Sequence, residues 1–335
     1  MIIRVTDPSH AGEARRHAAT LAGDAKLNDR DAGALAIVVT ELATNQVKHA
    51  GGGMIVVESV ELAGVAGVRT FALDKGPGIR DLNAALRDGY SSAGTPGNGL
   101  GAIKRLSHSF DIFSAPDLGT AIVSEFWRER KAKAHVLPLE LGVLSIPIKG
   151  EEVCGDGAGA KKMGDSMMMM VVDGLGHGIL AAEAAREAEN VFVSSRTESP
   201  GLILEDSHNA LKKTRGAAMA VASINLAHGV LTYAGIGNIG SSIVSPAGSR
   251  GMASHNGIVG HQVSKVQEFK FPWEAKSILV MASDGLKTNW DLKAYPGIWN
   301  KSAALIAGIL VSDFSRERDD VTVLVAKEHS DAGGS

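Results

Sequence analysis

The sequence predicts an α/β sandwich followed by an α+β domain, and three observations support this prediction. The chain has 335 residues, which at about 150 residues per domain indicates two domains. A charged segment that contains a proline, residues 128–140, interrupts the pattern of helices and strands in the way a linker does. Helices alternate with strand pairs before this segment, whereas strands dominate after it.

Residues 1–127 form the first predicted domain. A long helix is predicted over residues 28–50, because three glycines that follow it are a typical stop signal. Shorter helices are expected at residues 81–87 and 100–106, and strands at residues 54–61, 68–73, 110–113 and 120–126. We expect the helices to cover one face of a mixed sheet.

Residues 141–327 form the second predicted domain, and residues 328–335 a flexible polar tail. Strands are expected at residues 141–148, 166–172, 217–226, 229–234, 241–244, 277–282 and 321–325. Helices are expected at residues 180–193, 202–212 and 302–311. Many strands and few helices predict sheets flanked by helices.

Composition excludes several classes of protein. Hydrophobic residues make up 44% of the chain and charged residues 21%, which excludes a wholly disordered chain. The net charge of −3 argues against a general nucleic-acid binder, which needs a basic excess. No apolar run reaches the roughly 18 residues of a membrane span, and the N-terminus lacks a signal peptide. We therefore expect a cytoplasmic protein with neither a nucleic-acid nor a membrane partner.

The predicted helix 28–50 carries the first group of chemically suitable residues. Glu41, Asn45 and Lys48 share one face of this helix, because they stand four and seven residues apart. The carbonyl oxygen of an asparagine at such a place can bind a hard cation such as Mg²⁺. A solvated polar face with an ordinary i,i+4 pair is the alternative interpretation.

Two glycine-containing segments follow in the first domain. Asp74 opens the segment Asp-Lys-Gly-Pro-Gly; it could accept a hydrogen bond from an exocyclic amine, while Gly76 and Gly78 let the backbone approach a flat base. A type II turn is the alternative. Residues 91–101 are rich in glycine and lead into a helix, where free N–H groups can bind phosphate. A flexible loop is the alternative here.

Three segments resemble the conserved boxes of the GHKL ATPases and follow one another in the same order along the chain. Glu41–Asn45 resembles the N box, Asp74–Gly78 the G1 box and Gly97–Gly101 the G2 box. The resemblance implies the GHKL (Bergerat) ATP-binding fold. It also implies that Asn45 holds Mg²⁺ at the phosphates of ATP, Asp74 reads adenine, and Glu41 orients or deprotonates the attacking hydroxyl. The residues that it places around the nucleotide are Asn45, Asp74, Gly76, Gly78, Gly97, Gly99, Leu100 and Gly101.

Residues 81–110 look most like those of the RsbT switch kinases, which phosphorylate a serine or threonine on a STAS-domain partner. This resemblance implies RsbS-like or RsbR-like STAS proteins as partners, and a sigma-factor regulator as a further one. His49 is not expected to be a phosphate acceptor, because a histidine at a helix end is usually structural.

The second domain contains acidic residues next to glycine or at predicted strand ends: Asp156, Asp173, Asp284 and Asp319. Carboxylates gathered in this way are the ligands that hard divalent cations prefer, and two cations about 4 Å apart can activate water and bind a phosphoryl oxygen. A simple turn is the alternative for any single Asp-Gly pair.

The spacing of these residues resembles that of the metal-dependent PPM phosphatases of the SpoIIE/RsbX branch, over residues 140–327. The resemblance implies a β-sandwich flanked by helices, in which Asp173 bridges two Mn²⁺ or Mg²⁺ ions and the Gly174 carbonyl adds a ligand. Asp156 completes one metal site, and Asp284 with Asp319 completes the other. Water activated by the ions then attacks phosphoserine or phosphothreonine directly, without a covalent intermediate.

Three neighbouring features have simpler interpretations. Cys154 is rejected as a nucleophile, because acidic residues surround it in the sequence and would disfavour a thiolate. The run Met167–Met170 is expected to be the core of a strand rather than a soft-metal site. His177 could contact substrate phosphate or cap a helix.

Together the two resemblances predict a bifunctional regulator of a sigma-factor or stress-signalling pathway. One half would use Mg-ATP to phosphorylate a STAS-domain partner, and the other would remove phosphate from serine or threonine. The alternative is a non-catalytic ATP-binding module that binds an anti-sigma or STAS partner and is attached to an active phosphatase. In that case ATP would only set the conformation of the first half.

Overall fold

The computed structural model describes residues 2–62, 64–87, 99–129, 137–316 and 318–329. The chain divides into two compact units, residues 1–136 with 296–312 and residues 137–295 with 313–335. Of the predicted linker and tail, residues 130–136 and 330–335 lie outside the described residues. Each unit is described by itself.

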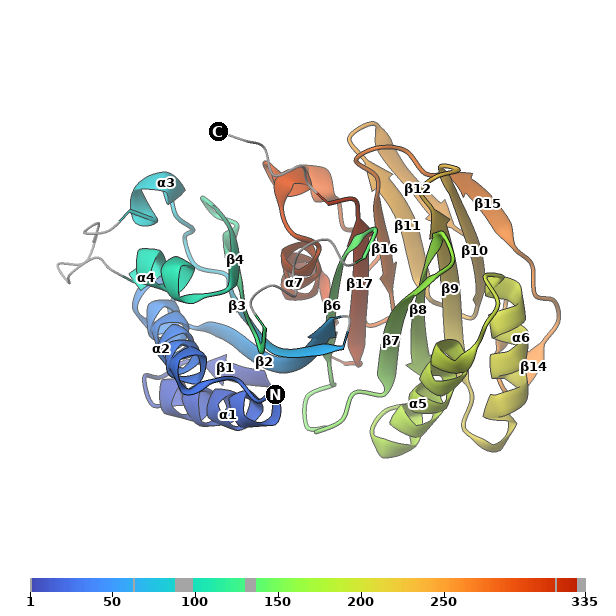
Figure 1. Cartoon of the computed structure of the whole chain (residues 1–335), viewed down its shortest axis with the longest axis horizontal. Coiled ribbons are helices and arrows are strands. Elements are labelled where there is room, and N and C mark those ends of the chain that lie inside the picture. The colour runs from blue at the N-terminus through green and yellow to red at the C-terminus, as the bar shows by residue number, and fades with distance from the viewer. Residues whose placement is uncertain (1, 63, 88–98, 130–136, 317, 330–335) are drawn as a thin grey trace. The chain divides into compact units, whose positions relative to one another are not determined.

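The first unit contains a five-stranded sheet with helices on both faces (Figure 1). In sheet order, the strands are β1 (Ile2–Val5), β2 (Gly53–Leu62), β3 (Val65–Asp74), β5 (Gly119–Trp127) and β4 (Ser109–Ala115). The helices are α1 (His10–Asp24), α2 (Asp29–Asn45), α3 (Leu82–Ala85) and α4 (Gly99–Leu106). All pairs of these strands are antiparallel, whereas we expected a mixed sheet. Short connections such as that from β4 to β5 impose this arrangement.

The sequence explains where helix α2 begins and where the helical segment ends. Asn28 caps its N-terminus, where the side-chain oxygen accepts a hydrogen bond from the Asp31 N–H at 2.9 Å. Beyond Asn45 the chain continues as a π-helical turn, Gln46–Ala50, and stops at Gly51, whose φ of 71° favours glycine. The helical segment predicted over residues 28–50 is therefore confirmed, with its last turn wider than an α-helix.

Helix α1 was not predicted, because it has few large apolar residues. It packs against the sheet through alanines spaced three or four positions apart, Ala11, Ala14, Ala18 and Ala22. The same unit includes most of α7 (Ala303–Phe314) from much later in the sequence. Asp111 on β4 accepts a hydrogen bond from the Ser302 N–H at 2.7 Å, at the start of this helix.

The second unit contains two five-stranded antiparallel sheets. One sheet has the order β15 (Phe269–Pro272), β10 (Val230–Ile236), β9 (Ala217–Asn225), β8 (Ser166–Gly174) and β7 (Asp156–Met163). The other has the order β12 (Gly248–Met252), β11 (Gly240–Ser245), β16 (Ile278–Ala282), β17 (Val321–Lys327) and β6 (Glu140–Ile146). A small hairpin of β13 (Gly257–Ile258) and β14 (Gln262–Val263) completes the strands of the described residues. Short 3-10 turns lie at Leu211–Lys213 and Leu292–Ala294 in this unit and at Ile298–Asn300 in the first unit.

Strand β8 shows how this unit is layered. Met167, Met169 and Val171 belong to the core formed with the second sheet, and the alternate residues Met168 and Met170 pack with helices α5 (Ile179–Ser194) and α6 (Pro200–Ala210). A strand buried on both faces needs a continuous apolar run, because neighbouring side chains point in opposite directions. The methionine run is therefore strand core, as predicted. Figure 1 shows the two helices along the outer face of this sheet.

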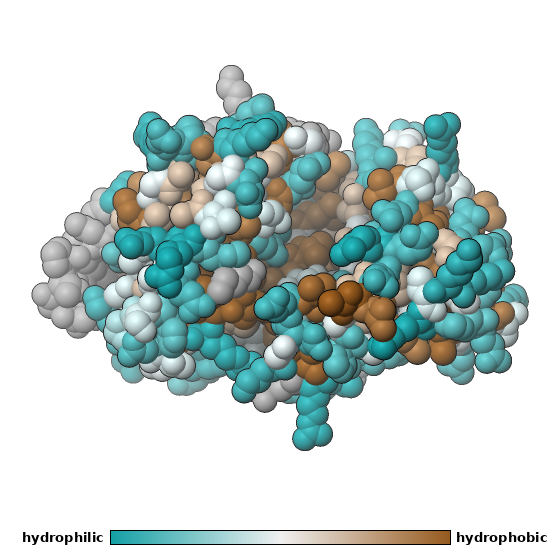
Figure 2. Space-filling view, turned by 90° about the horizontal axis from the view of Figure 1, so that it is seen from below, coloured by the Kyte–Doolittle hydropathy of each residue, from teal (hydrophilic) through white to brown (hydrophobic). Residues whose placement is uncertain are grey.

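Most apolar side chains of the described residues are buried. Hydrophilic residues predominate on the face seen in Figure 2, where hydrophobic residues form small groups. The exposed large hydrophobic residues include Leu175, Ile179 and Leu180, near the start of α5. None of the helices in the described residues is long and apolar enough to cross a membrane.

Candidate nucleotide and metal sites

The candidate nucleotide site begins on α2. Glu41 and Asn45 lie one turn apart, while Val38 and Leu42 of the same helix are buried in the core. A Cβ built on Gly99 would lie 3.6 Å from Glu41 Oε2 and 3.5 Å from Asn45 Nδ2. The structure therefore brings Glu41 and Asn45 together with the first residue of α4, where unpaired N–H groups of a helix can face an anion.

Asp74 is the last residue of β3, and its orientation is fixed by the backbone. Its Oδ1 atom accepts hydrogen bonds from the Gly76 N–H at 2.9 Å and from the Thr120 N–H at 3.2 Å. Burial raises the pKa of Asp74, and these two hydrogen bonds oppose that shift. The described residues donate no hydrogen bond to Oδ2, so this oxygen can accept one from a ligand.

The loop after Asp74 requires glycine at two positions. A Cβ on Gly76 would lie 2.7 Å from the Ala50 Cβ at the end of the π-helical turn. Gly78 has a φ of +72°, and a Cβ there would lie 2.0 Å from the Ala115 carbonyl oxygen. The loop is thus packed closely against its neighbours. Leu100 and Gly101 lie in the first turn of α4, and the predicted site residue Gly97 lies outside the described residues.

Gln46 is a residue of this region that the sequence analysis missed. Its buried side chain donates hydrogen bonds to the carbonyl oxygens of Met54 at 3.0 Å and Leu73 at 3.1 Å. These bonds tie the end of the helical segment to β2 and β3, directly before Asp74. A polar residue four positions after the core residue Leu42 was the available signal, since both lie on the apolar face.

The second unit brings together the four aspartates predicted from the sequence. Asp156 opens β7 and stands directly opposite Asp173 of β8 in the strand register. Asp284 follows β16, and its backbone N–H donates a hydrogen bond to the Asp173 carboxylate. Asp319 precedes β17 and forms a hydrogen bond with Asp284. The four side chains come from two sheets and meet where their strands begin or end.

Burial and mutual repulsion shift the pKa values in this cluster. Burial, followed by the charge of Asp173, raises the pKa of Asp156 to about 8. Burial, followed by the charges of Asp284 and Asp319, raises the pKa of Asp173 to about 7. Burial and the charge of Asp284 likewise raise the pKa of Asp319. Such shifts show that the protein alone does not balance these negative charges.

The cluster suits hard divalent cations. Asp156 Oδ2 is buried and has no hydrogen-bond partner among the described residues, which leaves it available to a cation. Over those residues, however, no group of three or more Asp, Glu, His or Cys side chains is arranged closely enough to hold a metal ion as it stands. Oxygen ligands that leave room for water are typical of Mg²⁺ and Mn²⁺ rather than of a structural zinc site.

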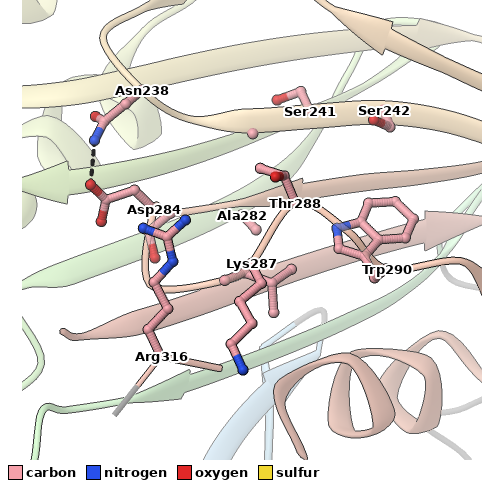
Figure 3. A pocket seen from close by; sticks show the side chains of 12 residues that line it. Asn238, Ser241, Ser242, Ala282, Asp284, Lys287, Thr288, Trp290 and Arg316 are labelled. Carbon is pink, nitrogen blue, oxygen red and sulfur yellow. Dashed lines mark hydrogen bonds between the residues drawn. The ribbon is translucent and has the colours of Figure 1, made fainter. Parts of the chain in front are cut away.

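Neighbouring residues hold the aspartates in place. Asn238 Nδ2 donates a hydrogen bond to Asp284 Oδ2 at 2.5 Å (Figure 3). Gly174 follows Asp173 directly, and a Cβ there would lie 2.2 Å from the Ala181 carbonyl oxygen, so this position requires glycine. These contacts fix the predicted site residues Asp284 and Gly174 at the edge of the cluster.

Two supporting residues, Asp320 and Ser283, belong to the motifs that resemble the PPM phosphatases but were assigned no role from the sequence. Buried Asp320 accepts hydrogen bonds from the Ile148 N–H at 2.6 Å and the Gly155 N–H at 2.8 Å, which fixes the chain beside Asp156. Buried Ser283 accepts a hydrogen bond from the Thr322 N–H at 2.9 Å and donates one to Asp156. The paired aspartates at positions 319 and 320 were a signal that one of them is structural.

Cys154 and His177 are two further residues that the sequence analysis considered. Burial and the charge of Asp156 raise the pKa of the Cys154 thiol to about 12, so it stays protonated at neutral pH. His177 Nδ1 lies 2.7 Å from Glu151 Oε1, on the exposed side of the turn that precedes α5.

Comparisons with known proteins match two family models to two separate ranges of the chain. A family model described as the histidine kinase-like ATPase domain matches residues 5–124. The family model of stage II sporulation protein E (SpoIIE) matches residues 163–329. The matched ranges contain the candidate nucleotide site and, except for Asp156, the aspartate cluster.

Two curated relatives come from Bacillus subtilis (strain 168). The serine/threonine-protein kinase RsbT is 37% identical over 97 residues, which cover 29% of this chain and 73% of RsbT. The phosphoserine phosphatase RsbX is 26% identical over 188 residues, which cover 55% of this chain and 92% of RsbX. Both matches agree with the resemblances predicted from the sequence.

Two solved structures share their fold with more than half of this chain. One comes from a study of the bacterial stressosome as a modular system adapted to control secondary messenger signalling; it is 28% identical, has a TM-score of 0.54, and is matched over 56% of this chain and 99% of its own. The other is RsbX in complex with magnesium, which is 24% identical, has a TM-score of 0.51, and is matched over 57% of this chain and 96% of its own. The predicted fold class and both predicted resemblances are thereby confirmed.

Proposed function

Because the chain belongs to the RsbT family of histidine kinase-like ATPases in its first part and carries a SpoIIE-type PPM phosphatase domain in its second, we propose that it is a partner-switching regulator with two opposing activities. The first part would phosphorylate a serine or threonine on a STAS-domain partner. The second part would hydrolyse phosphoserine or phosphothreonine on that partner or a related one.

The convergence of four aspartates around an unpartnered, buried carboxylate oxygen supports the phosphatase activity. Asp156 and Asp173, from the sheet that contains β7 and β8, would bind the cations from one side. Asp284 and Asp319, next to β16 and β17 of the other sheet, would bind them from the other side. Bound Mg²⁺ or Mn²⁺ would supply Lewis-acid chemistry for attack by water on the phosphoryl group. Asn238 would keep Asp284 in position, and Ser283 would do the same for Asp156.

Hydrolysis of p-nitrophenyl phosphate in the presence of Mn²⁺ tests this activity without knowledge of the protein substrate. Asp173→Asn should lower kcat/KM about a thousandfold, because it removes a negative charge shared by the cluster. Asp165→Asn is the matched control: Asp165 is exposed in the turn between β7 and β8 and should tolerate the same change. Equal activities of the two variants would contradict the assignment of Asp173.

The proposed kinase activity rests on the placement of Glu41 and Asn45 beside Gly99, and of Asp74 at the end of β3. Asn45 would hold the Mg²⁺ that accompanies ATP, and Asp74 Oδ2 would accept a hydrogen bond from the adenine amino group. Glu41 would orient or deprotonate the hydroxyl of the partner. Hydrogen bonding of Glu41 to a hydroxyl of the partner positions the nucleophile for transfer.

Transfer of labelled phosphate from ATP to an RsbS-like STAS protein tests the kinase activity. Glu41→Ala should abolish transfer while leaving ATP binding within about twofold, and the exposed Glu61→Ala should change neither. If the native protein binds ATP and transfers no phosphate, the first part is an ATP-dependent binding module. That result would contradict the kinase proposal and leave the phosphatase proposal standing.

A further inference from the structure

A pocket in the second unit lies beside Asp284 and has no role in the activities proposed so far (Figure 3). Its volume is about 370 Å³, at the small end of the range for ligand pockets. Its polar and aromatic lining includes Asn238, Ser242, Lys287, Thr288, Trp290 and Arg316. Asp284 forms part of the wall, so the pocket shares this residue with the aspartate cluster.

The backbone that carries the two basic residues is held firmly. The Lys287 N–H donates a hydrogen bond to the Phe314 carbonyl oxygen at 2.8 Å, and the Arg316 N–H donates one to the Gly285 carbonyl oxygen at 2.7 Å. A Cβ on Gly285 would lie 1.8 Å from the Asp320 carbonyl oxygen, so this turn is packed too closely for any side chain. The positions from which Lys287 and Arg316 extend are therefore set before a ligand arrives.

The charge of the pocket favours an anion. In the described part of the chain, Lys287 forms no ion pair. The charge of Arg316 acts on Asp319 and opposes the rise in the pKa of that carboxyl, and Figure 3 shows the Arg316 side chain beside Asp284. Cations bound by the aspartate cluster would neutralise Asp284. The lining would then carry two positive charges, hydroxyl groups from Ser242 and Thr288, and the indole of Trp290.

We propose that this pocket binds an acidic side chain of the phosphoprotein substrate, close in sequence to the phosphorylated residue. Lys287 and Arg316 attract the carboxylate, and Trp290 packs against its aliphatic part. The phosphate itself belongs at the aspartate cluster, so the pocket selects the sequence around the phosphorylated residue. This inference rests on the proposed phosphatase function and names the class of substrate that the phosphatase prefers.

Synthetic phosphoserine peptides test the inference with the full-length protein and Mn²⁺. Three peptides carry Glu, Gln or Lys at the positions two to four residues on either side of the phosphoserine and are otherwise identical. The native protein should show a kcat/KM about fivefold higher for the Glu peptide than for the Lys peptide, mainly through KM. High salt should shrink this preference, because it screens the charges.

A charge reversal provides the sharper test. Lys287→Glu should abolish or reverse the preference for the Glu peptide, whereas Lys270→Glu, on the exposed edge strand β15, should keep it. Equal kcat/KM values for the Glu and Lys peptides in the native protein would overturn the inference. So would a Lys287→Glu variant that retains the native preference.

The small phosphate ester separates this inference from the function on which it rests. If p-nitrophenyl phosphate and all three peptides are hydrolysed without discrimination, the acidic subsite is wrong and the phosphatase assignment stands. If neither the ester nor any peptide is hydrolysed with Mn²⁺ or Mg²⁺, the proposed phosphatase function fails, and the inference fails with it.

Discussion

The two candidate sites hold their carboxylates in opposite ways. Asp74 stands at the end of β3, where two backbone N–H groups already bind one of its oxygens. The aspartates of the second unit face one another, and burial with mutual repulsion raises the pKa of Asp156 to about 8 and that of Asp173 to about 7. Backbone N–H groups thus orient Asp74 in the first site, whereas in the second site the carboxylates repel one another and bound cations would balance their charges.

We expect the largest difference between substitutions of the adjacent residues Asp319 and Asp320, where one should affect activity and the other stability. Asp319→Asn should lower phosphatase kcat/KM about a thousandfold without lowering stability, because Asp319 takes part in the repulsion. Asp320→Ala should lower the free energy of unfolding by about 3 kcal/mol, because it leaves two backbone N–H groups without their acceptor. Phosphate release and chemical denaturation measure the two effects. Similar losses of stability in both variants would contradict the division of roles.

Ligand stabilisation should also distinguish the two units. Mn²⁺ at about a hundred times its dissociation constant should stabilise the protein by roughly 2.7 kcal/mol through the aspartate cluster, and Mg-ATP should act through the first unit. Calorimetry should show that Asp173→Asn removes the response to Mn²⁺ and keeps the response to Mg-ATP. Asp74→Asn should do the reverse. Loss of both responses in either variant would contradict independent sites.

The support of Asp74 by the helical segment can be tested at Gln46. Gln46→Ala should lower the free energy of unfolding by about 2 kcal/mol and weaken ATP binding, because it removes two partly buried hydrogen bonds to β2 and β3. Lys48→Ala, in the same π-helical turn but exposed, should change stability by less than about 0.5 kcal/mol. Denaturation in urea measures both. Equal stabilities would show that Gln46 does not hold the site together.

The smallest expected effect is the pH dependence of the metal-free protein. Asp156 and Asp173 have pKa values of about 8 and 7 in the folded state, above their usual value when unfolded, so the folded protein binds more protons between roughly pH 4 and 8. Stability in EDTA should therefore fall as pH rises through this window. Asp156→Asn should flatten the dependence. A melting temperature in EDTA that rises with pH would contradict the assigned shifts.

The sequence was sufficient for the elements with strong local signals. The predicted helix over residues 28–50 has a side-chain cap at one end and glycines at the other, and the run Met167–Met170 is apolar on both faces of its strand. Both motif sets also stand in the order that their families require, so the fold class could be predicted.

Other elements depend on contacts that no local pattern shows. Strand β7 is rich in glycine, alanine and lysine, and it is extended because it pairs with β8. The contact between Asp284 and Asp319, like the hydrogen bond from Ser283 to Asp156, joins residues far apart in the chain. The supporting residues Gln46 and Asp320 required the structure for the same reason. The roles proposed for the site residues remain predictions for the experiments above.

One time course tests the central proposal of opposing activities on one chain. The protein is mixed with an RsbS-like STAS protein, labelled ATP, Mg²⁺ and Mn²⁺, and the label on the STAS protein is followed. We expect Asp173→Asn to accumulate label to a higher and lasting level, Glu41→Ala to add none, and the native protein to show a transient or lower level. A native protein and an Asp173→Asn variant with identical time courses would contradict the proposal.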